Sequence, residues 1–126
     1  MGDNDLISIA LRFNERINAR DLTGLGELMT EDHVFIDIPG EVHKGRDMMV
    51  PGWFSFFKNY PDYRNNFTHV EVKQNLVIMI GFSECSHEPL DGPAIWTAKI
   101  RDGFIAEWRV YDDNKEVRME LAIDQL

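Results

Sequence analysis

The sequence predicts an α+β domain in which N-terminal helices close a curved antiparallel sheet around a small, mostly apolar pocket. Apolar residues in the first thirty positions recur at helical spacing, and the second half of the chain alternates with the period of two that strands show. Asp102-Gly103 is a strong hairpin signal between two such runs. With 126 residues, 44% of them hydrophobic, the chain is long enough to bury a core as one domain over residues 1–126.

Two helices are expected at the N-terminus. The first covers residues 4–19, with Asn4 as its N-cap, because its apolar side chains recur three and four residues apart. Asp21 is the expected cap of the second helix, which ends at Glu31-Asp32. The inward-facing stripe of the first helix consists of Leu6, Ile9, Ala10, Phe13 and Ile17.

A short strand and an aromatic helix follow. Alternation predicts the strand over residues 33–38, and Pro39-Gly40 turns the chain out of it. A cluster of aromatic side chains predicts a third helix over residues 46–60. Pro51 and Gly52 suit the first turn of a helix better than its interior, so this helix either starts late or is kinked.

The rest of the chain is predicted to form two strand hairpins and a short terminal helix. Gln74-Asn75 and Asp102-Gly103 are the expected turns, and Asp113 or Asn114 caps the terminal helix. The four expected strands cover residues 66–73, 76–86, 94–101 and 104–112.

A two-residue turn at Asp102-Gly103 pairs Arg101 with Phe104 and sets the register of the last hairpin. One face is then expected to hold Ile95, Thr97, Phe104, Ala106, Trp108, Val110 and Asp112, and the other Ala94, Trp96, Ala98, Ile100, Ile105, Glu107, Arg109 and Tyr111. A bulged three-residue loop would exchange the faces and put Trp96 in the place of Trp108. Both faces are largely apolar and the helices are few, so we expect a homodimer through the convex face.

Composition excludes several classes of function. A formal charge of −9 and the lack of a basic cluster argue against nucleic acid and anionic membranes as partners. Cys85 is the only cysteine, which rules out an internal disulfide and fits a reducing cytoplasm. There is no apolar run of bilayer length and no secretory signal, so a soluble cytoplasmic protein is expected. The histidines show no metal-ligand spacing, and no phosphate loop, serine elbow or dinucleotide fingerprint is present, so neither a metal nor a cofactor is expected.

The order and spacing of several short segments resemble a known group of proteins. These segments are residues 18–24, 34–40, 45–47, Asp102-Gly103, Glu107-Trp108 and Tyr111-Asp112. Together they resemble the nuclear transport factor 2-like superfamily, and within it the SnoaL-like polyketide cyclase and ketosteroid isomerase-like group. The resemblance spans nearly the whole chain and implies a cone-shaped α+β barrel with a single cavity. It does not fix an activity, because isomerases, cyclases, hydrolases, dehydratases and non-catalytic proteins share this fold.

Mapped onto this sequence, the resemblance implies an aromatic pocket and three polar candidates. Asp112 matches the proposed general acid/base of SnoaL-like cyclases, with capping of the terminal helix as the equally weighted alternative. Asp37 roughly matches the base of ketosteroid isomerases, although a turn carboxylate is the slightly favoured interpretation. His87 could carry a second proton, but a strand-edge residue is favoured. The expected apolar lining consists of Phe13, Phe35, Trp53, Phe57, Trp108 and Val110.

Departures from the isomerase pattern disfavour steroid isomerisation. Phe13 stands where the isomerases have their oxyanion-binding tyrosine, and no carboxyl group lies near residues 95–97 to act as the second donor. We therefore expect a small cofactor-independent enzyme of the cyclase or isomerase type that acts on a hydrophobic carbonyl compound by acid/base proton transfer. A non-catalytic small-molecule-binding module and a dimeric interaction domain are the alternatives.

Overall fold

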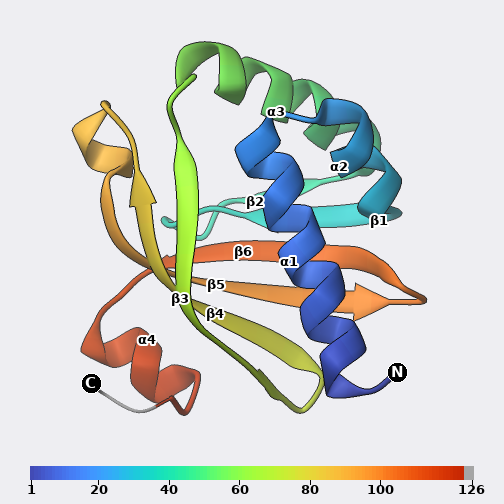
Figure 1. The fold of residues 1–126 in the computed structure, drawn as a ribbon, viewed down its shortest axis with the longest axis vertical. Helices are drawn as coiled ribbons and strands as arrows, with labels where there is room; N and C mark the ends of the chain where they lie inside the picture. The colour runs from blue at the N-terminus through green and yellow to red at the C-terminus, as the bar shows by residue number, and fades with distance from the viewer. Residues whose placement is uncertain (124–126) are drawn as a thin grey trace.

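The computed structural model describes residues 1–123 and confirms the predicted fold class. Helices lie against one curved six-stranded sheet with the strand order β2-β1-β6-β5-β4-β3 (Figure 1). Neighbouring strands are antiparallel except β1 and β6, which are parallel. The elements are α1 (Asp3–Ala19), α2 (Leu22–Leu28), β1 (Met29–Ile36), β2 (Val42–Lys44), α3 (Arg46–Asn59), β3 (Arg64–Lys73), β4 (Leu76–Glu84), η1 (Glu88–Leu90), β5 (Gly92–Arg101), β6 (Phe104–Asp112) and α4 (Lys115–Glu120).

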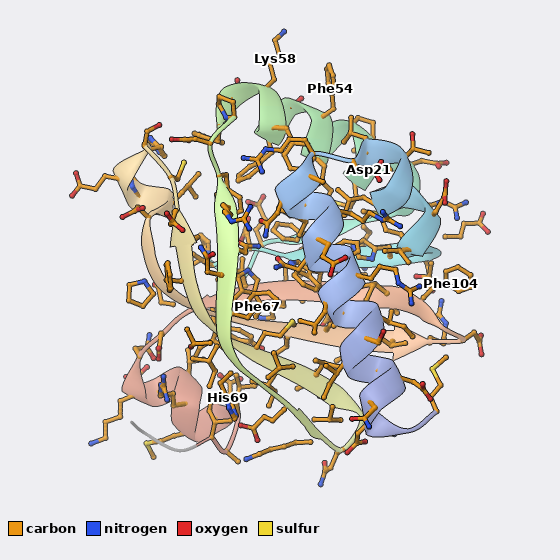
Figure 2. The ribbon with its side chains drawn as sticks, in the orientation of Figure 1. Asp21, Phe54, Lys58, Phe67, His69 and Phe104 are labelled. Carbon is orange, nitrogen blue, oxygen red and sulfur yellow. The ribbon has the colours of Figure 1, made fainter. Side chains whose placement is uncertain are left out.

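Several elements differ from the predictions in their bounds, and α3 differs in its interior. β1 begins at Met29, directly after α2, and β2 was not expected because it has only three residues. α3 begins at Arg46 and continues through Pro51, so the proline lies inside the helix. The inward face of α3 carries Trp53 and Phe57, whereas Phe54 and Lys58 point away from the molecule (Figure 2). No helix in residues 1–123 is both long and apolar enough to cross a membrane.

The register of the last hairpin corrects the predicted faces. Arg101 pairs with Phe104 as expected, but the register shifts beyond Ile100–Ile105, so Lys99 pairs with Glu107 and Ala106 is the extra residue. Trp108 consequently faces Ala98 across the hairpin, and Val110 faces Trp96. The prediction that Ile95 and Thr97 share the face of Trp108 is therefore wrong. β5 and β6 each have one tryptophan on the concave face, because the bulge lies inside β6 and not in the turn.

The main core fills the space between α1 and the concave face. Phe13 and Ile17 of α1 are fully buried there with Trp96 and Trp108. A second cluster covers part of the convex face, where Ile78, Ile80 and Ile95 pack with Ile123, which follows α4. Much of the convex apolar surface is thus covered within one chain. The homodimer stays a prediction, and Phe82, 40% exposed, is an apolar residue on that face that remains accessible.

Candidate functional site

A cavity of about 810 Å³ opens between α3, the β1–β2 connection, the η1 segment and the concave face of the sheet. Its volume falls within the range of ordinary small-molecule sites. The cavity wall at this end of the sheet consists of small residues: Ser83 pairs with Gly92, and both line the cavity with Ala94. The sheet bends at the same place, because β3 carries a register shift after Phe67 and its backbone passes close to Gly81.

Aromatic side chains form much of the cavity wall. All three tryptophans of the chain, Trp53, Trp96 and Trp108, line it together with Phe35. The rings of Phe35 and Trp53 meet edge to face with their centroids 5.8 Å apart. The indole N–H of Trp53 is buried and has no hydrogen-bond partner among the described residues.

The buried part of the wall carries three uncharged polar side chains, Tyr63, Asn65 and Ser83. Burial raises the pKa of Tyr63 to about 12, although hydrogen bonds with Ser83 and Asn65 act in the opposite direction. The phenol therefore keeps its proton at neutral pH and remains a hydrogen-bond donor. The Ser83 hydroxyl itself donates to the carbonyl oxygen of Leu90, which ties the η1 segment to this group.

Helix α1 holds this polar group in place. Asn18 makes two hydrogen bonds of 2.9 Å with the backbone of Asn65, one to its carbonyl oxygen and one from its N–H. The Asn65 side chain donates to Asn14 Oδ1 over 3.0 Å. Polar residues beside the apolar inner face of α1 thus fix the start of β3, where Tyr63 and Asn65 enter the cavity wall.

Asp37 and His43 form a hydrogen-bonded pair where the cavity opens to solvent. His43 Nε2 lies 3.1 Å from Asp37 Oδ2, and the Glu41 N–H donates to Asp37 Oδ1 over 2.8 Å. Partial burial acts to raise the pKa of Asp37, but the hydrogen bonds from His43 and the backbone outweigh it, and the pKa is lowered. An ionised Asp37 accepts the Nε2 proton and leaves Nδ1 of the ring as the proton acceptor.

The same segment brings together three groups that could hold a metal ion. Oxygen or nitrogen atoms of Asp37, Glu41 and His43 lie within 4.8 Å of one another, which the sequence spacing did not indicate. Glu41 is exposed, and its backbone N–H already bonds Asp37. Clusters of this kind are common near protein surfaces, and nothing else at this position points to a cation.

The structure places Asp112 at the mouth of the same cavity. Phe35 lies beside Trp108, so the alternation of β6 carries Val110 and then Asp112 outward along the cavity wall. Asp112 is exposed, and the Asn114 side chain, not Asp112 or Asp113, accepts the capping hydrogen bond of α4 from the Val117 N–H. Of the predicted site residues, the cavity therefore gathers Asp112, Asp37, Phe35, Trp53, Trp108 and Val110.

Three predicted site residues lie elsewhere. Phe13 is fully buried behind the wall, with its ring centroid 4.7 Å from that of Trp108. Phe57 packs against the far side of Trp53 at 5.5 Å. His87 precedes η1 and packs on the ring of Tyr60 at 5.1 Å, outside the cavity lining. Helical spacing places Phe13 and Phe57 on the inward faces of their helices but does not say how deep in the core they lie.

Sequence reasoning missed Tyr63, Asn65, Ser83 and His43. Tyr63 directly precedes β3 and Asn65 lies inside it, and the predicted strand, which starts at residue 66, includes neither of them. Ser83 lay inside a predicted strand, but a serine there gives no signal of its own. His43 was hidden by β2, which is too short to show a period.

The fold is that of an α+β protein in which helices and one curved sheet enclose a cavity. Residues 10–108 match the sequence model of the SnoaL-like domain, and the chain belongs to that family. No curated protein sequence matches it significantly. The fold is shared with a candidate polyketide cyclase from Sinorhizobium meliloti, at 18% identity and a TM-score of 0.74, over 82% of this chain and 93% of that one.

Two further structures show how widely this fold is used. A candidate SnoaL-like polyketide cyclase from Shewanella putrefaciens has 17% identity and a TM-score of 0.75, over 93% of this chain and 85% of that one. An LEH-like epoxide hydrolase from M. tuberculosis has 14% identity and a TM-score of 0.76, over 88% and 84%. At these identities the likeness establishes the fold alone.

Proposed function

We propose that this chain is an acid/base enzyme that binds a hydrophobic carbonyl compound and moves a proton next to the carbonyl group, as in cyclase and isomerase reactions. The observation that carries the proposal is that one cavity holds both a neutral hydrogen-bond donor and a candidate base. A neutral phenol donor, Tyr63, lies in the buried part of the wall, and a hydrogen-bonded carboxylate–imidazole pair lies at the opening. Aromatic rings between them suit a flat or cyclic body.

The proton transfer uses the chain's own side chains. The Nδ1 atom of His43 takes a proton from the carbon next to the carbonyl group, and the C–H bonding electrons move into the enolate. Asp37 holds the ring through Nε2 and stabilises the imidazolium that forms. The enolate oxygen accepts a hydrogen bond from Tyr63, and His43 then returns the proton to complete the cycle.

Asp112 is the rival base. The sequence resemblance favours it, and it lines the same cavity, but it is exposed to solvent. His43, with its oriented ring, is therefore our first choice and Asp112 the second.

Hydrogen–deuterium exchange tests the proposal directly. 1-Adamantyl methyl ketone is a compact apolar ketone whose methyl protons exchange in D₂O only through the enol or enolate, and NMR follows their loss. We expect the protein to accelerate this exchange at pH 8. We expect His43→Gln to abolish the acceleration and Tyr63→Phe to lower it by about 10- to 100-fold. His69→Gln, an exposed histidine on another part of the sheet, is the matched control (Figure 2).

The variants also separate the candidate functions. Full activity of His43→Gln with loss in Asp112→Asn would transfer the role of base to Asp112. Binding of the ketone with no exchange in the wild type would instead favour a non-catalytic binding module. The exposure of Asp112 and of part of the His43 ring is the specific observation that keeps this second function in consideration, because water can reach both groups.

A further inference from the structure

We propose that the mouth of the cavity is a charge filter that admits uncharged or cationic ligands and rejects anionic ones. This inference rests on the proposed function, because it names the class of ligand that the same cavity takes. It gives a role to Asp91, which the proton transfer does not use, and a second role to Asp37 and Asp112.

The charged lining residues are confined to the mouth. Among the described residues of the lining, three carboxylates, those of Asp37, Asp91 and Asp112, oppose one ammonium group, that of Lys44. The buried polar side chains of the wall are all uncharged at neutral pH, and no arginine lines the cavity. The interior therefore offers no counter-charge to a carboxylate or phosphate that has left water.

The carboxylates of Asp91 and Asp112 face the opening without cationic partners. Asp91 accepts a hydrogen bond of 2.9 Å from the Cys85 N–H, which fixes its orientation, and it makes no ion pair within residues 1–123. Asp112 pairs with Ala94 of the neighbouring strand β5, and it too makes no ion pair within residues 1–123. Both belong to the β5–β6 side of the mouth, so their potentials add.

The other side of the mouth adds apolar surface around Asp37, His43 and Lys44. Ile38, Val42 and Met48 line the cavity yet are 41%, 48% and 71% exposed. These three side chains come from the β1–β2 connection, β2 and α3. The apolar part of an entering ligand thus contacts apolar side chains at the mouth. The carboxylates of Asp91 and Asp112 repel a ligand that carries a negative charge. The mouth is selective for charge without being closed to hydrophobic compounds.

Three nearly isosteric probes test the filter. 1-Adamantyl methyl ketone is neutral, adamantane-1-carboxylate is anionic and 1-(1-adamantyl)ethylammonium is cationic at pH 8. Because all three tryptophans line the cavity, their fluorescence reports binding. Both ions lose hydration on entry, so the difference between cation and anion isolates the effect of charge sign. At low salt we expect the cation to bind at least tenfold more tightly than the anion.

Variants and salt must change this preference in predictable directions. Asp91→Asn with Asp112→Asn should narrow the preference for cation over anion at least threefold. Lys44→Gln should widen it, and 0.5 M NaCl should narrow it in the wild type, where no substitution is involved. Glu31→Gln with Glu120→Gln, two exposed acids outside the cavity, is the control of equal charge change and should have little effect.

Each outcome bears on the inference. Equal affinities for the cation and the anion in the wild type, or equal narrowing in the control double variant, would overturn the filter while ketone binding upheld the proposed function. Failure of all three probes to bind would instead count against the proposed function, and the filter would fall with it.

Discussion

Tyr63 shows how one side chain changes the chemistry available to this fold. The sequence places Phe13 at the position of the isomerase tyrosine and so indicates a pocket without a phenol donor. The structure brings Tyr63 into the cavity wall from the start of β3 and buries it, and burial raises its pKa to about 12. The donor is thus present but comes from another element, with Asn65 and Ser83 beside it.

Gly81 is a residue whose substitution should damage the scaffold of the cavity. A Cβ atom at this position would collide with the carbonyl oxygen of Asn66 on the neighbouring strand. We expect Gly81→Ala to lower the free energy of unfolding by about 3 kcal/mol, measured by urea denaturation. Gly52→Ala is the control: its Cβ would meet open space on α3, and alanine in a helix should stabilise by about 0.5–1 kcal/mol. A neutral effect of Gly81→Ala would contradict the close approach of β3 and β4.

His33 should make the protein less stable in mild acid. Its ring is fully buried; burial lowers its pKa, and the hydrogen bond between Nδ1 and the Ile105 carbonyl oxygen offsets this only in part. Below about pH 6.5 the unfolded chain binds a proton at this histidine that the folded chain does not, so stability falls as pH falls.

Urea denaturation between pH 7.5 and 5.5 measures this effect. His33 alone should contribute a slope of at most about 1.4 kcal/mol per pH unit. His33→Asn should remove that part of the slope, while His69→Gln, which replaces an exposed histidine, should not. Identical slopes in the wild type and His33→Asn would show that burial of His33 does not govern the pH dependence.

At the scale of elements, most of the fold could be predicted from the sequence. The helical stripe of α1, the turns at Gln74-Asn75 and Asp102-Gly103, and the long strands all carry strong local signals. Positions that depend on distant contacts could not be predicted. The bulge at Ala106 is one of these, since it moves Thr97 to the convex face and Trp96 to the concave one.

The candidate site was predictable in outline and not in detail. Alternation along β1 and β6 correctly associates Phe35, Asp37, Trp108 and Val110 with one cavity. Alternation could not predict the contact between Asp37 and His43. His43 lies in β2, and only the pairing of β2 with β1 brings its ring to Asp37. Nor could alternation find Asn65, whose place depends on Asn14 and Asn18 of α1.

The terminal helix should contribute to stability through Ile123. This residue follows α4 and packs on Ile78, Ile80 and Ile95 of the convex face. Ile123→Ala should lower the free energy of unfolding by about 2–3 kcal/mol in urea denaturation. Met119→Ala, at a side chain 66% exposed on α4, should have almost no effect. Equal effects of the two changes would mean that α4 does not cover the sheet in solution.

At the scale of the whole molecule, the homodimer is the prediction that remains open. α4 covers part of the convex face, so the surface left for a second chain is smaller than the sequence suggested. Sedimentation at micromolar concentration should give twice the chain mass of 14.6 kDa, and Phe82→Glu should shift the equilibrium towards the monomer. A wild type that sediments only as a monomer would rule out this assembly.

The whole molecule is also acidic, with a formal charge of −9, and the cavity mouth shares this sign. Surface and mouth thus favour the same uncharged or cationic ligands, while the interior offers aromatic surface and neutral donors. The proposed proton transfer therefore requires one arrangement: a hydrophobic ketone inside the cavity, with its oxygen towards Tyr63 and its reacting carbon towards His43.

A crystal structure of the complex with 1-adamantyl methyl ketone tests this arrangement most directly. We expect the cage among Trp53, Trp96 and Trp108, the ketone oxygen within hydrogen-bond distance of the Tyr63 hydroxyl, and the methyl carbon closer to His43 than to Asp112. A ketone bound with its oxygen pointing out of the mouth, or bound outside the cavity, would contradict the account.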